Sequence, residues 1–209
     1  MIENYTQLQN GIIKQNNFFV KKKKYDVEYV DVRYNTYGEK NVQISFLRLG
    51  YIIGSLGKIP SSILDVGYGN ANFITACSKI ISNCYGNDVS NYPLPDSIKF
   101  VDNIYKEHYD VVTFFDVLEH FENIYDIKNL KCNYIVISVP WCHYHSDKWF
   151  VDWKHRRPDE HLWHFNEKSI VNFFNEIGFT CVNKTNIEDT IRKPTDEHSN
   201  ILTCTFKKI

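Results

Sequence analysis

The sequence predicts an α/β fold with a doubly wound, seven-stranded sheet that is mostly parallel and has an antiparallel last strand. Three observations carry this prediction. After residue 57, apolar strand-like segments alternate with segments of helical period. Most of the apolar segments are continuous, as in parallel strands that helices cover on both faces. No helical pattern separates the last two strand-like segments, so we expect these two to pair in antiparallel fashion.

The first expected element is a helix from Val42 to Leu56, in which apolar residues recur at helical spacing and which Gly57 ends. A second helix is expected at residues 71–81. The seven strands are expected at residues 62–66, 84–87, 98–101, 111–115, 134–139, 180–187 and 201–205. This succession of strands and helices is typical of the α/β class.

The helix with the clearest ends is expected at residues 167–177. Asn166 can cap its first turn, and Phe165 can pack against Ile170 as a hydrophobic staple. Gly178 stands where a left-handed residue ends many helices. The pattern therefore predicts both ends of this helix as well as its interior.

Length and composition favour a single domain over residues 1–209, with a polar amino-terminal extension at residues 1–40 and an insertion at residues 141–166. The formal net charge of −1 gives no general attraction to nucleic acid or to an acidic membrane surface. Six cysteines without a C-x-x-C pair suit a reducing compartment, and no signal peptide or membrane span is recognisable. These features predict a cytoplasmic protein and leave its oligomeric state open.

Residues 63–73 hold the most informative motif of the chain. An apolar strand brings in Asp65, a tight turn follows at Gly67 and Gly69, and a helical pattern begins after the turn. Glycines let the backbone approach a ligand closely, and the N–H groups at a helix start are free to bind it. We therefore expect a nucleotide-like ligand. Asn72 stands where a dinucleotide fingerprint has its third glycine, which disfavours an NAD-dependent oxidoreductase.

Four successive expected strands end at an aspartate, namely Asp65, Asp88, Asp102 and Asp116. In open α/β sheets the ligand lies beyond the carboxyl ends of the strands. A single acidic residue after a strand is often only a turn residue. Four in succession, with the glycine turn at the first, indicate a binding site at this edge of the sheet.

The motif Asp-Val-Gly-Tyr-Gly at residues 65–69, together with residues 109–120 and 161–166, resembles class I S-adenosylmethionine-dependent methyltransferases of the small-molecule (type 11 and type 23) subfamily. The resemblance covers roughly residues 43–209. Ala71 replaces the family's usual third glycine and adds only a methyl group. The resemblance implies a Rossmann-like methyltransferase fold and an enzyme that uses S-adenosylmethionine.

The resemblance also assigns the cofactor-binding residues, which are Asp65, Gly67, Tyr68, Gly69, Asp88, Val89, Asp102, Asn103, Asp116 and Val117. In this assignment Asp88 takes both ribose hydroxyls of the cofactor, and Asp102 bonds the adenine amino group. The ammonium of the methionine end would lie near Asp65, because a carboxylate is its natural partner.

A possible metal site is formed by Asp116, Glu119 and His120, which follow one another at positions i, i+3 and i+4. If a helical turn begins at Asp116, the three side chains project from one face. A similar pattern binds a divalent metal in ubiquinone-type O-methyltransferases and in small-RNA 3′-end 2′-O-methyltransferases, where a later histidine joins; its match here is His161. Ligand hardness favours Mg²⁺, and histidine also permits Mn²⁺ or Zn²⁺. Metal-free relatives keep Leu-Glu-His as well, so both readings stay open.

The 141–166 insertion is chemically unlike the rest of the chain, because it holds all four tryptophans and five of the eight histidines. It also holds the basic cluster of residues 154–157. Such a segment can cover a planar or sugar-like acceptor that carries negative charge, or it can simply pack its tryptophans onto the core. His161 and His164 are the candidate general bases, because the ordinary histidine pKa lies near working pH.

The leading hypothesis is therefore O-methylation of a small-molecule acceptor, with nitrogen as the alternative target atom. A second hypothesis makes RNA the acceptor, bound by residues 154–157 and by the lysine run at residues 21–24. It predicts affinity that falls steeply with salt. A third is a catalytically silent binding protein that keeps the fold, which the four strand-end acids disfavour and a failure to bind S-adenosylmethionine would support.

Overall fold

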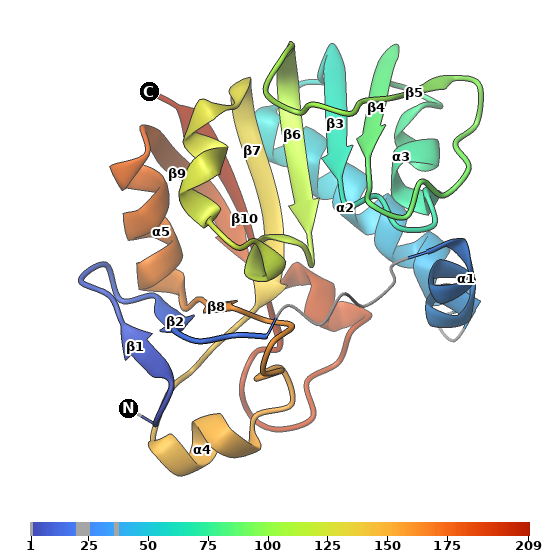
Figure 1. Ribbon diagram of the computed structural model, residues 1–209. Coiled ribbons are helices and arrows are strands. Elements are labelled where there is room, and N and C mark those ends of the chain that lie inside the picture. Colours follow the sequence, from blue (N-terminus) through green and yellow to red (C-terminus); the bar gives the residue numbers. More distant parts are fainter. Residues whose placement is uncertain (1, 20–25, 36–37) are drawn as a thin grey trace.

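The computed structural model describes residues 2–19, 26–35 and 38–209, so the lysine run at residues 21–24 lies outside the described residues. Its main sheet has seven strands in the order β5-β4-β3-β6-β7-β10-β9 (Figure 1). The strands are β3 (Ser62–Val66), β4 (Asn83–Asn87), β5 (Ile98–Phe100), β6 (His108–Phe115), β7 (Lys131–Pro140), β9 (Phe179–Thr185) and β10 (Ile201–Lys208). The strands from β5 to β7 are parallel, and β10 is antiparallel to both β7 and β9. The predicted fold class is confirmed.

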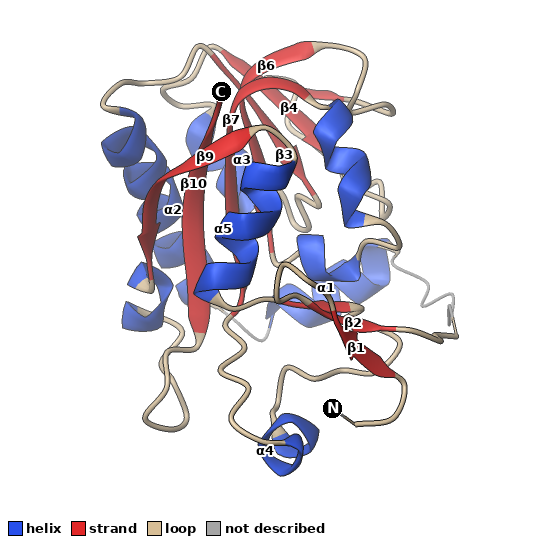
Figure 2. Ribbon diagram, turned by 90° about the vertical axis from the view of Figure 1, so that its left-hand side faces the viewer, coloured by secondary structure: helices blue, strands red, loops and turns tan. Residues whose placement is uncertain are grey.

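Helices cover both faces of this sheet because successive strand residues point to opposite sides. Ile63 packs in the core beneath α2 (Lys40–Leu56) and α3 (Asn72–Cys77). Its neighbour Leu64 lies on the other side, in the core cluster that also holds residues of α5 (Glu167–Glu176) and of the 3₁₀ helix η2 (Ile124–Asn129). Figure 2 shows the sheet between these layers. The continuous apolar strands in the sequence are explained by this two-sided burial.

Both ends of the clearest predicted helix are confirmed. The Asn166 side chain accepts a hydrogen bond from the Ser169 backbone N–H at 2.8 Å, and the Ser169 hydroxyl accepts one from the Asn166 backbone N–H at 2.9 Å. This capping box satisfies two backbone donors at once. Gly178 follows the helix in the left-handed region with φ +88°. The helix α3 is shorter than predicted and ends at Cys77.

A second, small sheet joins the amino-terminal segment to the insertion. It contains β1 (Tyr5–Gln7), β2 (Ile13–Gln15) and β8 (Trp163–His164), all antiparallel. The Gln15 side chain donates to Asp159 Oδ1 at 2.8 Å and accepts from the Asp159 backbone N–H at 2.9 Å. From the sequence, residues 1–40 are expected only as a polar extension, so the hairpin is an addition to that prediction. Figure 1 shows that this hairpin lies beyond the carboxyl ends of the central strands.

The remaining elements surround that same edge of the main sheet. They are α1 (Val27–Asn35), α4 (Asp147–Asp152) and the 3₁₀ helices η1 (Leu118–His120) and η3 (Ile187–Thr190). Within the described part of the chain, no helix is both long and apolar enough to cross a membrane.

Candidate active site at the carboxyl edge of the sheet

The loop after β3 requires glycine at position 67. Gly67 has φ +73°, and a Cβ there would lie 2.3 Å from Val117 Cγ2. Its backbone N–H donates to the Asn87 carbonyl at 2.7 Å. The loop therefore packs its backbone directly against the segment after β6 and is bonded to the end of β4. These contacts bring the ends of three neighbouring strands together.

The Asp88 carboxylate is held in a fixed orientation by two backbone donors. Gly69 N–H donates to Oδ2 and Ser90 N–H donates to Oδ1, each at 2.8 Å. Each carboxylate oxygen can accept more than one hydrogen bond, so both keep capacity for a ligand. Ala71 has φ +61°, which is the left-handed conformation that glycine adopts without strain. Replacing the family's glycine by Ala71 therefore adds backbone strain as well as a methyl group.

Asp65 is buried at the end of β3, where it is only 3% exposed. The Thr113 hydroxyl of β6 donates to its Oδ1 at 2.7 Å. Burial raises the pKa of Asp65 to about 7, while the Thr113 hydrogen bond and the Arg48 guanidinium partly oppose that rise. A cationic ligand group at this place would favour the ionised form.

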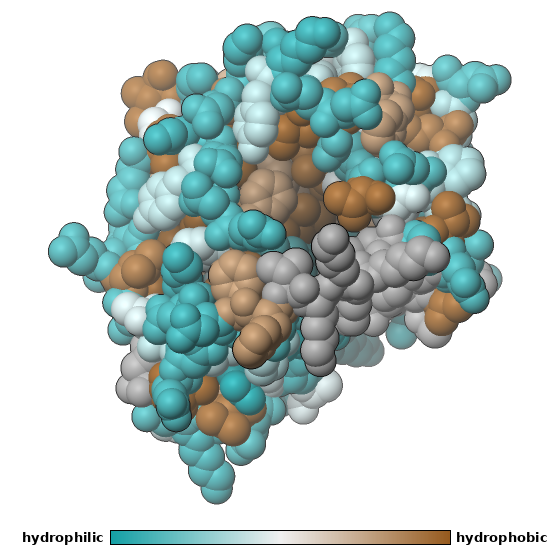
Figure 3. Space-filling view, in the orientation of Figure 1, coloured by the Kyte–Doolittle hydropathy of each residue, from teal (hydrophilic) through white to brown (hydrophobic). Residues whose placement is uncertain are grey.

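The other predicted cofactor-binding residues lie along the same edge with different exposure. The Tyr68 hydroxyl donates to the Tyr92 carbonyl at 2.7 Å, and burial raises the pKa of Tyr68 to about 12. Val89 is 79% exposed, and Asp102 and Asn103 are exposed after β5. Figure 3 shows the face of the molecule that is seen in Figure 1, and in its middle, over β6, apolar side chains are visible between polar ones.

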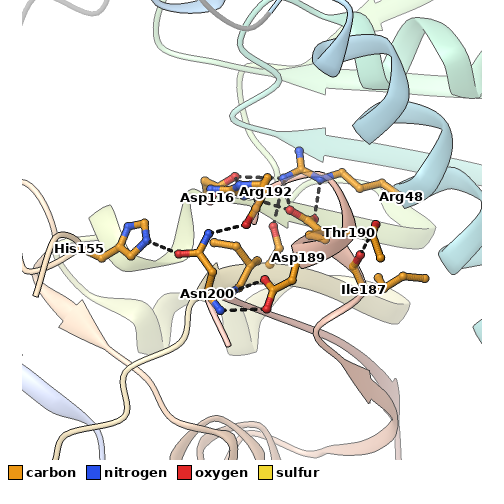
Figure 4. Close-up of polar contacts among 11 residues, drawn as sticks. Arg48, Asp116, His155, Ile187, Asp189, Thr190, Arg192 and Asn200 are labelled. Carbon is orange, nitrogen blue, oxygen red and sulfur yellow. Dashed lines mark hydrogen bonds and ion pairs between the residues drawn. The ribbon is translucent and has the colours of Figure 1, made fainter. Parts of the chain in front are cut away.

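Asp116 follows β6 with φ +60°, and its carboxylate lies between two arginines (Figure 4). Arg48 Nη2 donates to Asp116 Oδ2 at 3.0 Å, and Arg192 Nη1 donates to it at 2.8 Å. Both arginines also bind Glu188, which is fully buried, at 2.7 Å and 3.0 Å. The two guanidinium groups hold the pKa of Asp116 well below its usual range.

Three members of this network were not predicted as site residues. Arg48 lies on α2, inside a helix pattern that is read from its apolar residues. Glu188 and Arg192 are spaced by four residues in the polar stretch before β10, a spacing that suits a salt bridge on a helical turn. The i, i+4 spacing could have indicated the pairing of Glu188 with Arg192. It does not indicate that Glu188 also binds Arg48 or that Arg192 also binds Asp116.

Glu119, His120 and His161 lie together. One ligand atom from each of them can be chosen so that all three atoms are within 4.8 Å of one another. Both carboxylate oxygens of Glu119 are buried without a hydrogen-bond partner among the described residues. Burial, with Asp116 nearby, raises the pKa of Glu119 to about 8. A bound cation would supply the missing partner.

Both histidines of this group have one ring nitrogen bonded to a backbone carbonyl, which leaves the other nitrogen available to a ligand. His120 Nδ1 contacts the Glu160 carbonyl, and His161 Nδ1 contacts the His155 carbonyl, each at 2.8 Å. A carbonyl oxygen only accepts, so Nδ1 carries the proton in each ring and Nε2 keeps its lone pair. Metal-binding histidines are commonly oriented in this way by a backbone carbonyl. Asp116 does not belong to the group, because its positive φ keeps it out of the turn formed by η1.

The two candidate general bases are both buried. Burial lowers the pKa of His161 to about 2 and that of His164 to about 3. A proton acceptor works best when its pKa lies near working pH, so these environments disfavour proton abstraction by either ring. His164 lies on β8, with Tyr5, Phe150 and Trp153 around it.

The insertion divides its tryptophans between the core and a surface cavity. Trp163 is buried, and its indole N–H donates to the Phe121 carbonyl at 2.6 Å. Trp149 and Trp153 stack on each other with ring centroids 5.4 Å apart. Trp163 therefore packs onto the core, which was one of the two expected roles, and the covering of an acceptor stays a prediction.

The sequence matches the model of a family described as a methyltransferase domain, over residues 47–184. No curated protein matches it. Among solved structures, the magnesium protoporphyrin IX methyltransferase of Synechocystis PCC 6803 with bound S-adenosylhomocysteine is similar, with a TM-score of 0.62 and 14% identity over 88% of this chain and 96% of that chain.

Two further structures share the fold. The 1,6-didemethyltoxoflavin-N1-methyltransferase of Burkholderia thailandensis has a TM-score of 0.62 and 15% identity, over 87% of this chain and 84% of that chain. The methyltransferase domain of bacterial CtHen1 has a TM-score of 0.53 and 17% identity, over 77% of this chain and 97% of that chain. At these identities the similarity shows a common fold.

Proposed function

The chain belongs to the methyltransferase-domain family, and we propose that it transfers a methyl group from S-adenosylmethionine to an oxygen atom of a small-molecule acceptor. The sulfonium of this cofactor already activates the methyl group. The protein then has to hold the cofactor, align the acceptor and keep competing water out. The observation that carries the proposal is the Asp88 carboxylate, which two backbone N–H groups hold beside the glycine loop.

The cofactor would lie along the carboxyl ends of four adjacent strands. Asp88 at the end of β4 would accept the two ribose hydroxyls, since each of its oxygens keeps accepting capacity. Buried Asp65 would face the ammonium of the methionine end, and Asp102 after β5 would face the adenine. These three carboxylates, all hydrogen-bond acceptors, thus suit a ligand with a sugar in the middle and a cationic group at one end.

We assign the acceptor side to Glu119, His120 and His161, as ligands of a divalent cation. Two imidazole nitrogens and one carboxylate suit Mn²⁺ or Zn²⁺ better than Mg²⁺, which prefers oxygen ligands. Such a cation would lower the pKa of an acceptor hydroxyl that binds to it. This assignment uses the low pKa of His161, because a neutral imidazole is the form that binds a metal. In this assignment His161 is a metal ligand and no longer the general base that was expected from the sequence.

The cofactor part is tested by calorimetry with S-adenosylhomocysteine. Asp88→Asn should weaken its binding at least tenfold, because buried ribose hydroxyls lose a charged acceptor. Asp96→Asn is the matched control, since Asp96 is an exposed aspartate before β5. Equal affinities of the two variants would contradict the role of Asp88. No binding by the unaltered protein would support a catalytically silent protein instead.

The metal part is tested separately, by titrating Mn²⁺ into protein that has been treated with EDTA. Glu119→Gln should abolish the tight site, and Glu122→Gln should not, because Glu122 is exposed beyond η1. Turnover that is insensitive to chelator, or a Glu119→Gln protein that binds Mn²⁺ normally, would refute the assignment.

An RNA acceptor is the second candidate, and the same metal group favours it through the resemblance to small-RNA methyltransferases. The basic cluster of residues 154–157 is only partly available to phosphates, because Arg157 pairs with Glu160 at 3.1 Å. Affinity for a single-stranded oligonucleotide that falls steeply between low and high salt would support RNA over a small molecule.

A further inference from the structure

A cavity of about 440 Å³ lies between α4 and the loop at residues 194–200. Its volume is within the range of small-molecule sites. Figure 1 shows both segments beyond the carboxyl end of β7, on the side of the small sheet. The cavity is thus at the edge of the sheet where the ligand of an open α/β fold binds.

Stacked rings fix the walls of this cavity. His198 of the loop lies beside both His143 and His145, and its ring centroid is 5.2 Å and 4.5 Å from theirs. Next to them, Trp149 and Trp153 stack at 5.4 Å with an interplanar angle of 21°. His143, His198 and both indoles line the cavity. The site is therefore preformed and offers flat, weakly polar surfaces on which a ring can stack.

The cavity also carries unpaired positive charge. Lys148 and Lys154 line it, and within the described part of the chain neither forms an ion pair. Burial lowers the pKa of Lys154, with Asp196 opposing that shift. Two carboxylates are present as well, Asp152 and Asp196, and Asp196 accepts a hydrogen bond from the His198 backbone N–H at 2.8 Å. An anionic group of a ligand would form ion pairs with the two lysines, and the two carboxylates would accept hydrogen bonds from its hydroxyl groups.

The cavity is joined to the proposed transfer site by Asn200, which lines it. The Asn200 side chain bonds His155 Nε2 at 2.8 Å and the Arg192 carbonyl at 2.9 Å (Figure 4). Arg192 in turn binds Asp116 at the end of β6. Asn200 therefore links the wall of the cavity to the residues at the end of β6.

We propose that this cavity binds a ring compound with an anionic substituent: the ring stacks on Trp149 and Trp153, and the phosphate or carboxylate binds Lys148 and Lys154. The identification of this compound as the remote end of the methyl acceptor rests on the function proposed above. The binding itself does not depend on it. The shared chemistry admits a pyrimidine nucleotide or an aromatic carboxylate as the source of the ring and the charge.

The test is a titration of the protein with uridine 5′-monophosphate and with 4-hydroxybenzoate, followed by tryptophan fluorescence and calorimetry. Neither probe contains the adenosine of the cofactor. At least one should bind with a Kd below about 1 mM, and the double variant Lys148→Gln/Lys154→Gln should weaken that binding at least fivefold, since two charged partners are lost. Lys128→Gln on η2, which is exposed away from the cavity, is the matched control and should change it less than twofold.

Comparison with ribose 5-phosphate and uridine separates the two parts of the site. Both should bind at least tenfold more weakly than the nucleotide, because one lacks the flat ring and the other lacks the charge. Saturating S-adenosylhomocysteine should leave probe binding within twofold. If S-adenosylhomocysteine does not bind at all, the proposed function fails while the titration still tests the cavity.

Three outcomes would overturn the proposal. The first is no binding of either probe at about 5 mM. The second is unchanged affinity in the double lysine variant. The third is an oligonucleotide that binds at least a hundredfold more tightly than uridine 5′-monophosphate, which would make the cavity one part of a nucleic-acid surface.

Discussion

Replacing Gly67 by alanine tests the packing of the glycine loop against the segment after β6. Two costs are expected. A non-glycine residue in the left-handed region costs about 1–2 kcal/mol, and a methyl group forced into a filled space costs about 1–3 kcal/mol. The packing cost applies because the new Cβ would lie 2.3 Å from Val117 Cγ2 and 3.3 Å from Val117 Cγ1. Gly67→Ala should therefore lower the free energy of unfolding by about 2–5 kcal/mol, measured by urea denaturation.

Two control variants separate these costs. Gly57 has φ +65° and nothing within 4 Å of an added Cβ, so Gly57→Ala should show the backbone strain alone, about 1–2 kcal/mol. In a double-mutant cycle, Val117→Ala should recover the contact cost, because it removes Val117 Cγ2 and Cγ1, the two atoms nearest to the new methyl group. Additive losses in the cycle, or a Gly67→Ala loss no larger than that of Gly57→Ala, would refute the reasoning.

Three further changes follow from the site. The pKa of Asp65 is raised to about 7 in the folded state, so the folded protein holds this proton more tightly than the unfolded chain. The contribution of Asp65 to the free energy of unfolding is therefore full below about pH 4 and is lost as pH rises towards 7. Asp65→Asn should remove this decline, as measured by urea denaturation at several pH values. Glu188→Gln should destabilise the protein by about 3–5 kcal/mol, since Asp116 would be the one carboxylate left to the two arginines in this network. An unchanged unfolding midpoint would contradict a structural role. His161→Ala should abolish tight Mn²⁺ binding and reduce turnover, with S-adenosylhomocysteine affinity unchanged by calorimetry; equal loss of both affinities would show that His161 supports the cofactor pocket.

The centre of the main sheet could be predicted because strands such as β3 and β6 are buried on both faces and end at recognisable residues. Ser62–Val66 shows this well, since the predicted and observed bounds agree. The small sheet could not be predicted in the same way. Its strands β1 and β2 are three residues long, and β2 pairs with residues 163 and 164, far along the chain. Such short polar segments show no periodicity, so only their tertiary contacts define them as strands.

The site was predicted in part for a related reason. The acids at the strand ends and the glycine loop are local features, visible in a few consecutive residues. The partners of Asp116 are not local, because Arg48 precedes it by 68 positions and Arg192 follows it by 76. The metal group was predicted by assuming a helical turn from Asp116. The positive φ of that residue breaks the turn, so Glu119 and His120 lie with His161 while Asp116 binds the arginines.

Leu162 gives the hairpin at the beginning of the chain an influence on the proposed metal ligands. Its backbone N–H donates to the Glu119 carbonyl at 2.8 Å, and its carbonyl accepts from Gln15 N–H at 2.9 Å. One residue therefore ties η1, the insertion and β2 together, although the hairpin adds no strand to the main sheet. A substitution in β2 would therefore act on the proposed metal ligands through Leu162, at a distance from the glycine loop after β3.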